Sequence, residues 1–418
     1  MPSRGQKRQF RQQIGALWRQ PPSPRSKPSS RCHSAGYFCK SLYGLALGYE
    51  DLSDHDELRA DPLLAVLSGK RAAGERSLAG KSTLNRLELS TEKADRYKKI
   101  ECHQAAIDEL LVRVFLEAHS VPPASIVLDL DATDLPLYGH QEGRFFHGYY
   151  DEYCYLPLYI FAGEHLLCAR LRTADQDAAA GSKTEVERIV ALVRAAWPET
   201  AITVRADSGF CREELMQWCE TNNVHYVLGC ARNDRLLRSI EPQLAEAAQL
   251  HAETGKAARV FTEFDYQTRE SWSRARRVVA KAEQLDGKAN PRFVVTNLTA
   301  EQWAAQALYE QLYCARGEME NRIKEQLSLF ATRVSSESMR ANQLRLSFAG
   351  CAYVLLHALR RLGLQGTVLE HAQATTIRLK LLKLGARIRI TARKVWLSLT
   401  AGFPLQTVFQ QAWRQLRC

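Results

Sequence analysis

The stretch SIVLDLDAT, residues 125–133, predicts a β-strand that decides the fold. Its two acids, Asp129 and Asp131, are two residues apart, so both side chains lie on one face of the strand. The residues around them are apolar, and isolated acids in a buried strand are costly unless they are paired or bind a metal ion. The alternative is a strand end at which both acids face water.

The sequence after this strand predicts a mixed α/β sheet covered by helices. Two more extended stretches follow directly, and strands and helices then alternate. We predict strands at 153–163, 165–172, 201–207 and 224–230, and helices at 183–196 and 212–221.

The pattern changes in the second half of the chain. Two strand-like runs, ARVFTEFDY and RFVVTNL, predict a β-rich insertion within residues 231–300. Helical spacing returns at 302–330 and 338–362. The segment IRLKLLKLGARIRIT, residues 377–391, alternates with a period of two around Gly385 and predicts a basic β-hairpin.

These patterns divide the chain into six parts. Residues 1–40 form a basic segment rich in Pro, Ser and Arg that should not pack. The others are a helical region at 41–120, the core at 121–230, the β-rich insertion at 231–300, the rest of the core at 301–362, and a basic extension at 363–418.

Charge is distributed unevenly over the 418 residues. Residues 1–40 contain nine Lys and Arg and no acid, and residues 341–418 contain twelve and one acid, whereas the whole chain is only +11. Basic ends suit phosphate backbones, and an acidic centre suits DNA only where carboxylates hold divalent cations. The alternative is basic tails and a solvated acidic surface.

Composition indicates an ordinary soluble protein. Hydrophobic residues make up 45% and charged residues 25%, and no apolar run is long enough to span a membrane. The basic N-terminus lacks the apolar segment of a secretory signal. The eleven cysteines form no CxxC pair, which predicts reduced thiols in the cytoplasm.

Two further groups of residues can join the strand acids. Asp207 ends a predicted strand in RADSGF, where ligands bind in open α/β sheets, although an Asp before Ser-Gly also suits a simple turn. Tyr313, Arg316, Glu320 and Lys324 fall on one helical face, which could equally be a solvated face with internal ion pairs. Two strand aspartates and one helix glutamate can hold two Mg²⁺ ions for phosphodiester displacement.

Together these residues resemble a DDE transposase of the IS1380 insertion-sequence family, in the IS4-like group of the RNase H-like superfamily. The resemblance extends from about residue 42 to 416 and is carried by LALGYEDLSDHDELRADPLLA, LAGKSTLNRLEL, LDLDATD, FFHGYYDEYCYLPLYIF, RADSGF, ARGEMENRIKE and IRLKLLKLGARIR. It implies an RNase H-like mixed sheet core flanked by helices, with a β-rich insertion and an N-terminal helical region that binds DNA at 41–120. It also implies a cytoplasmic protein associated with the nucleoid.

The resemblance implies a catalytic, metal-binding triad of Asp131, Asp207 and Glu320. Related transposases carry the first acid as Asp-x-Thr/Ser, which favours Asp131 over Asp129. The wider group has a Tyr-x2-Arg-x3-Glu-x6-Lys signature, and Tyr313, Arg316 and Glu320 match it. Leu327 occupies the lysine position, and Lys324 and Arg322 are the nearest substitutes.

The implied activity is cleavage at the element's ends and strand transfer into target DNA, with two Mg²⁺ or Mn²⁺ ions and a homodimer on the DNA. The expected DNA-binding residues are Tyr313, Arg316, Asn321, Lys324, Lys81, Arg378, Lys380, Lys383, Arg387 and Arg389. The first forty residues do not resemble the family and suggest an altered reading frame, which predicts impaired recognition of the ends. There are two alternatives. One is a catalytically impaired DNA-binding relative that acts as a repressor, and the other is a host RNase H-like nuclease.

Overall fold

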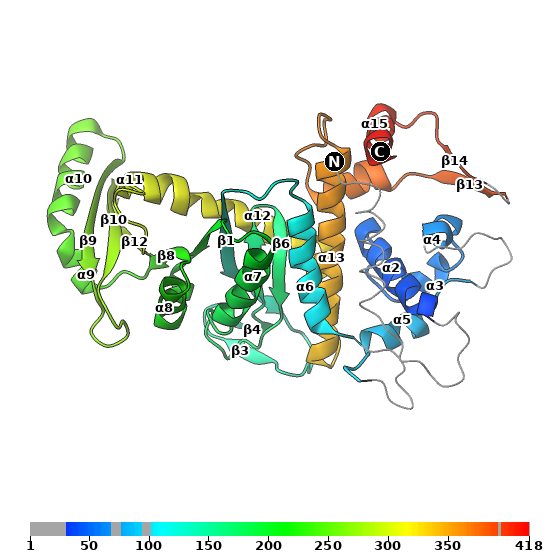
Figure 1. Cartoon of the computed structure of the whole chain (residues 1–418), viewed down its shortest axis with the longest axis horizontal. Coiled ribbons are helices and arrows are strands. Elements are labelled where there is room, and N and C mark those ends of the chain that lie inside the picture. Colours follow the sequence, from blue (N-terminus) through cyan, green and yellow to red (C-terminus); the bar gives the residue numbers. More distant parts are fainter. Residues whose placement is uncertain (1–30, 68–76, 94–101, 392–393, 418) are drawn as a thin grey trace.

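The structure, a computed structural model, describes residues 31–67, 77–93, 102–391 and 394–417. The molecule is elongated, with a central sheet, a helical region at one end and an extension of the sheet at the other (Figure 1). In these ranges no helix is both long and apolar enough to span a bilayer.

The predicted strand is β1 (Ser125–Ala132), and it lies in the middle of the sheet. It pairs in parallel with β7 (Ala201–Ala206), which pairs in parallel with β8 (His225–Cys230). On its other side β1 is antiparallel to β5 (Leu158–Ala162), which is antiparallel to β6 (His165–Arg170). This order, with three antiparallel strands and then two parallel ones, is that of an RNase H-like core, so the predicted fold class is confirmed.

Helices cover both faces of the sheet. The crossover helices α7 (Ser182–Ala196) and α8 (Glu213–Thr221) pack with Leu128 and Leu130 of β1 on one face. The acids of β1 alternate with those leucines and therefore point to the other face, where α12 (Gly317–Gln326) and α13 (Met339–Gly363) pack. Helix α6 (Gln104–Glu117) lies along the outer strand β6.

The insertion at 231–300 contains the predicted strands, β9 (Ala258–Tyr266) and β12 (Arg292–Thr296), and more. The charged stretch between them forms β10 (Arg276–Leu285) and the short β11 (Lys288–Ala289), and two helices precede them, α9 (Asp234–Ser239) and α10 (Glu241–Thr254). Because β12 pairs with β8, the insertion extends the central sheet.

The sequence before α12 forms an irregular helical rod rather than one regular helix. It comprises α11 (Ala305–Ala307), the π-helical η3 (Leu308–Tyr313) and the 3₁₀ turn η4 (Cys314–Arg316), and after α12 it continues as the π-helical η5 (Leu327–Ala331). Such irregular turns inside helices often mark functional positions.

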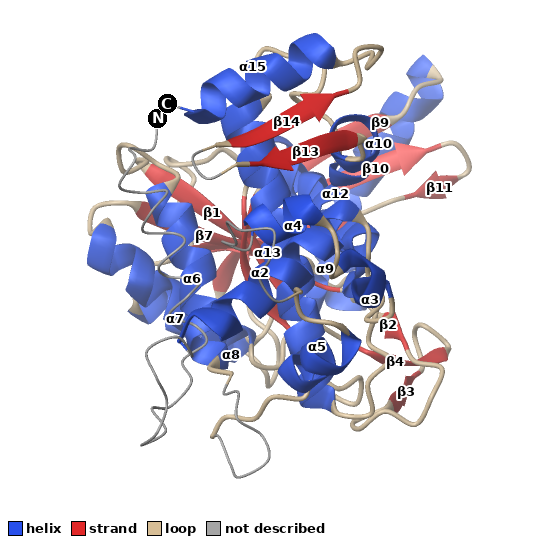
Figure 2. Ribbon diagram, turned by 90° about the vertical axis from the view of Figure 1, so that its right-hand side faces the viewer, coloured by secondary structure: helices blue, strands red, loops and turns tan. Residues whose placement is uncertain are grey.

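A separate three-stranded sheet follows β1. Its strands are β2 (Leu135–Pro136), β3 (Phe145–His147) and β4 (Glu152–Tyr155), in the order β2-β4-β3. Figure 2 shows it as a small unit outside the main sheet.

The N-terminal helices are α2 (Arg31–Leu47), α3 (Asp54–Leu58), α4 (Pro62–Leu67) and α5 (Lys81–Glu88), and α2 packs on α13. The prediction that residues 1–40 do not pack is therefore wrong for residues 37–40. Phe38 is fully buried against Phe348, and this apolar contact orders the segment. Residues 1–30 lie outside the described part.

The C-terminal extension corrects the predicted hairpin. Residues 374–382 form α14 (Ala374–Ile377) and the π-helical η6 (Arg378–Leu382), because Ile377 and Leu381, four residues apart, are both buried in the core. The hairpin is instead β13 (Ala386–Ile390) with β14 (Val395–Leu399), and α15 (Gln406–Arg417) follows.

Candidate active site

Asp131 and Asp207 face each other across one guanidinium group. Asp131 lies near the end of β1 and Asp207 directly follows β7, and parallel neighbouring strands bring their carboxyl ends to one edge of the sheet. Nη2 of Arg316 lies 3.6 Å from Oδ2 of Asp131 and 3.6 Å from Oδ2 of Asp207. Three predicted site residues, far apart in sequence, therefore meet here.

Asp129 has a different environment. Arg205 lies directly opposite it on β7, donates from Nε and Nη2 to both carboxylate oxygens at 2.5 and 2.8 Å, and also donates to the carbonyl of Leu312. Both side chains of this pair are less than 10% exposed. The Asp129–Arg205 pair therefore connects β1 and β7 to the helical rod. Because both oxygens of Asp129 are used in this pair, Asp131 is favoured as the acid available for chemistry.

The surroundings of Asp131 disfavour its ionised form. Burial, together with the negative charges of Asp207 and Glu320, raises the pKa of Asp131 to about 6 against the opposing effect of Arg316. Buried acids with strongly perturbed pKa values are common at functional sites. The negative charge of Glu320 makes the smallest of these contributions to the pKa of Asp131.

Asp207 is held in a tight turn. Its Oδ1 accepts a hydrogen bond of 2.8 Å from the amide of Gly209 and caps the short 3₁₀ helix η2 (Ser208–Phe210). The alternative interpretation of RADSGF as a turn is thus also correct, and the second oxygen, Oδ2, is the one that faces Arg316.

Gly229 of β8 leaves room for this turn. A methyl group built on Gly229 would come within 2.6 Å of the Tyr313 hydroxyl, 2.9 Å of the Ser208 amide and 3.1 Å of the Asp207 carbonyl carbon. The glycine therefore sets the close approach of β8, the Asp207 turn and the rod. Sequence reasoning missed it, although a glycine inside a strand is the usual signal of such an approach.

We expect Gly229→Ala to displace Asp207 or Tyr313. Overpacking of this kind costs about 1–3 kcal/mol, and urea unfolding should detect that loss of stability. Metal-dependent DNA cleavage should fall more than stability alone explains. Gly163→Ala, where no atom lies within 4 Å of the added methyl but φ is +57°, controls for simple loss of stability; equal activity of both variants would contradict the packing role of Gly229.

The remaining predicted residues of α12 differ in exposure. Glu320, Asn321 and Lys324 are exposed. Arg322 is engaged elsewhere, because it pairs with buried Glu325 at 2.9 Å and with Glu164 at 3.1 Å. Lys324 is therefore the one of the two substitutes for the missing signature lysine that faces solvent.

The predicted basic residues outside the rod fall into three groups. Lys81 begins α5 and pairs with Asp56 at 3.4 Å. The expectation that Arg378, Lys380 and Lys383 lie on the hairpin is wrong, since the first two are in η6 and the third follows it. Arg378 is buried over the Phe330 ring, whereas Arg387 and Arg389 are exposed on β13.

Asp131, Asp207 and Glu320 are the candidate metal ligands. Within the described ranges, no three His, Cys, Asp or Glu side chains are already spaced to hold an ion. Asp131, Asp207 and Glu320 nevertheless supply the hard oxygen donors that Mg²⁺ prefers, and Arg316 contacts two of them. The donor set fits a divalent ion provided that Arg316 withdraws from the carboxylates.

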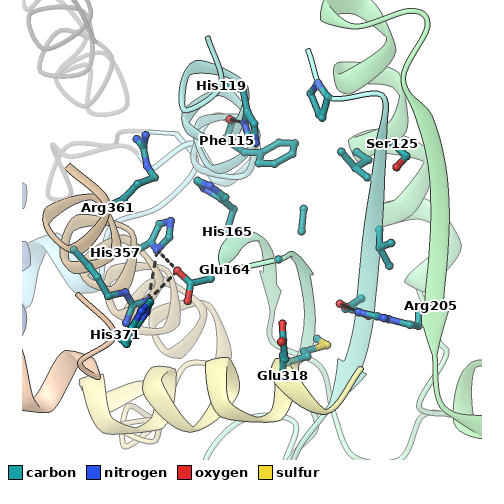
Figure 3. A pocket seen from close by; sticks show the side chains of 18 of the residues that line it. Phe115, His119, Ser125, Glu164, His165, Arg205, Glu318, His357, Arg361 and His371 are labelled. Carbon is teal, nitrogen blue, oxygen red and sulfur yellow. Dashed lines mark hydrogen bonds and ion pairs between the residues drawn. The ribbon is translucent and has the colours of Figure 1, made fainter. Parts of the chain in front are cut away.

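A cavity of about 560 Å³ lies beside these residues, lined by parts of α6, β1, α12 and α13 (Figure 3). Asp129, Arg205 and Glu318 line one side of this cavity, and a cluster of His119, His165 and His357 lines the opposite side. The rings of His165 and His357 are 4.6 Å apart, His119 lies 5.6 Å from His165, and Glu164 lies 3.5 Å from Nδ1 of His357. Burial lowers the pKa of His165 to about 3 and that of His357 to about 2, so both are neutral near pH 7.

This cluster predicts acid sensitivity. Below pH 6.5 the unfolded chain protonates His165 and His357 while the folded chain does not, so stability falls as pH decreases, by about 2 kcal/mol for each of the two between pH 7 and 5. His165→Phe, which retains the ring contact with Phe115, should remove about half of the histidine contribution. Urea unfolding at both pH values measures this, and an unchanged loss in the variant would show that His165 does not carry it.

Comparison with known proteins identifies the family. The family described as "Transposase DDE domain group 1" matches residues 9–418. This chain belongs to that DDE transposase family. The match begins at residue 9, so the expectation that the first forty residues depart from the family is wrong from that point onward.

A cryo-EM structure of the piggyBac transposase synaptic complex with hairpin DNA matches with a TM-score of 0.42 and 11% identity, over 88% of this chain and 74% of that chain. A search of curated proteins found no match.

Proposed function

We propose that this chain is the transposase of an insertion sequence of the IS1380 type, which cleaves DNA at the element's ends and joins the freed ends to target DNA. One observation carries the proposal: Asp131 and Asp207 converge on Arg316 in a chain of the DDE transposase family. Glu320, exposed on α12, is the proposed third acid.

The residues have distinct proposed roles. Asp131, Asp207 and Glu320 would hold Mg²⁺ or Mn²⁺, which when bound activates water and offsets the charge that develops on a phosphodiester. Arg316, released from the two aspartates, is placed to pair with a DNA phosphate, since guanidinium groups bind phosphate in bidentate fashion. The Tyr313 hydroxyl and the Asp207 turn both lie close to Gly229, so the hydroxyl is near the acids.

The hairpin of β13 and β14 is the proposed phosphate-binding arm. Its register places Arg387 opposite Ser398 and Arg389 opposite Trp396 on one face, and Lys394 also lies over the Trp396 ring. The other face carries only Ala, Ile, Val and Leu. DNA would therefore contact the basic face, with Asn321 and Lys324 near the acids and Lys81, Lys380 and Lys383 as further contacts.

We expect replacement of both Arg387 and Arg389 by Ala to weaken binding to duplex DNA of any sequence. Each lost phosphate contact should reduce the slope of log affinity against log salt by about 1, so by about 2 in all. Arg113→Ala, on an exposed helix surface paired with Glu109, is the control. An unchanged slope in the double variant would exclude the arm from the interface.

The test of function uses the purified chain, Mg²⁺ or Mn²⁺, and duplexes with or without the inverted repeats that flank the gene. The expected result is cleavage at the ends of the repeats only, followed by joining to a second DNA. Binding without cleavage would instead indicate an idle DNA-binding relative, and cutting of DNA without repeats would indicate a nuclease.

A further inference from the structure

We propose that Cys211 and Cys230 form a redox-active dithiol, which a peroxide oxidises to a disulfide beside the Asp207 turn. Reduced thiols are the resting state of this pair, and the disulfide is the product of its oxidation. The dithiol itself goes beyond the proposed function; only its expected effect on DNA cleavage rests on that function.

The two cysteines lie on backbone segments that touch each other. Cys211 directly follows η2, the short helix that Asp207 caps, and Cys230 is the last residue of β8. A methyl group built on Gly229, the neighbour of Cys230, would come within 3.1 Å of the Asp207 carbonyl carbon. The fold therefore brings two cysteines that are distant in sequence to adjoining positions at one end of the sheet.

The two thiol groups interact directly. A hydrogen bond with the Cys211 thiol lowers the pKa of Cys230, against the opposite effect of burial. The same hydrogen bond, together with burial, raises the pKa of Cys211, while the positive charges of Arg212 and Arg276 oppose this. Because the thiolate is the nucleophilic form of cysteine, Cys230 is the attacking sulfur and Cys211 is the thiol that stabilises it.

Both thiols can be reached by a small oxidant. Cys211 and Cys230 are half-buried, and the Cys230 sulfur lies 3.9 Å from the carbonyl oxygen of Ala231 at an exposed position. Cys219 and Cys351, by contrast, are buried, and burial raises the pKa of each to about 12. Since oxidation of cysteine follows exposure and thiolate character, the dithiol is the more reactive site.

The oxidation is balanced by one molecule of hydrogen peroxide. The Cys230 thiolate attacks a peroxide oxygen, so an S–O bond forms, the O–O bond breaks, and the leaving hydroxide takes up the proton that Cys230 had lost. The Cys211 sulfur then attacks the Cys230 sulfur; the S–S bond forms, and hydroxide leaves as water with the proton of the Cys211 thiol. Two thiols are thus oxidised to one disulfide, and the peroxide is reduced to two molecules of water.

The disulfide draws on the turn that holds Asp207. Its two sulfur atoms lie about 2.05 Å apart, closer than two hydrogen-bonded thiols, so the bond moves Cys211 toward β8. The movement reaches the carboxylate, because the amide of Gly209 in the same turn donates to Oδ1 of Asp207 at 2.8 Å. A misplacement of about 1 Å can cost about 100-fold in rate. Oxidation should therefore slow DNA cleavage, and reduction should restore it.

The first experiment detects the bond in the full native chain without DNA. The protein is treated with equimolar hydrogen peroxide, blocked with iodoacetamide and digested with trypsin without reduction. Mass spectrometry should find peptide 206–212 joined to peptide 213–232, and fragmentation between Cys219 and Cys230 assigns the bond to Cys230. Cys211→Ser and Cys230→Ser should each lose this product. Cys314→Ser, which removes an exposed thiol outside the pair, should keep it.

The second experiment measures cleavage at the element's ends before and after oxidation. Peroxide should slow the native chain and Cys314→Ser by up to about 100-fold, and dithiothreitol should restore both rates. Cys211→Ser and Cys230→Ser should cleave at the native reduced rate and should be insensitive to peroxide.

The outcomes separate the dithiol from the proposed function. Oxidised native protein without the linked peptide, or with Cys211 joined to another cysteine, would overturn the dithiol. A chain that carries the bond but cleaves at its reduced rate would overturn the effect on Asp207. A chain that cleaves no element end in either state fails the proposed function alone, because formation of the bond is measured without DNA.

Discussion

Replacing Asp131 with Asn should abolish metal-dependent DNA cleavage while the protein stays folded. Metal stabilisation of a phosphodiester transition state is worth several kcal/mol, so losing one ligand should reduce the rate at least about a thousandfold. Asn has the same shape but cannot supply the charged oxygen. The measurement is the single-turnover rate of nicking at an element end.

The free energy of unfolding of Asp131→Asn serves as an internal control for the cleavage measurement. The pKa of Asp131 is raised to about 6, so at neutral pH the folded protein holds a carboxylate whose ionised form it disfavours. Removing that charge should leave the free energy of unfolding unchanged or slightly higher. A cleavage-competent Asp131→Asn protein would overturn the assignment of the first acid.

Replacing Asp129 with Ala should have the opposite result, with stability as the main loss. The change leaves the Arg205 guanidinium buried without its counter-charge, and breaking such a pair costs about 3–5 kcal/mol. Urea unfolding measures this loss directly. Any loss of cleavage should follow the loss of folded protein.

A double variant tests whether the unpaired buried Arg205 causes this loss of stability. Asp129→Leu combined with Arg205→Met removes both charges and keeps apolar volume, so it should recover much of the stability lost by Asp129→Ala. It leaves the Leu312 carbonyl without its donor, so recovery should be incomplete. A stable Asp129→Ala protein that fails to cleave DNA would make Asp129 the catalytic acid instead.

The sequence alone predicts the helices and strands correctly where the local pattern agrees with burial in the fold. Strand β1, crossover helices α7 and α8, and strands β7 and β8 all lie where their periodicity predicts, because each is amphipathic or apolar over its whole length. The segment 377–382 shows the limit: its alternation also places Ile377 and Leu381 four residues apart, and packing of both in the core selects a helix.

The candidate site likewise depends partly on local sequence and partly on tertiary contacts. The sequence by itself determined that Asp131, Asp207, Arg316 and Glu320 are candidates, since spacing alone places acids on a strand face and at a strand end. Only the tertiary structure decided the different environments of Asp129 and Asp131, because the register of β1 against β7 pairs Asp129 with Arg205 across 76 residues. Such pairings, like the approach of Gly229 to the Asp207 turn, depend on contacts between distant segments that no local pattern encodes.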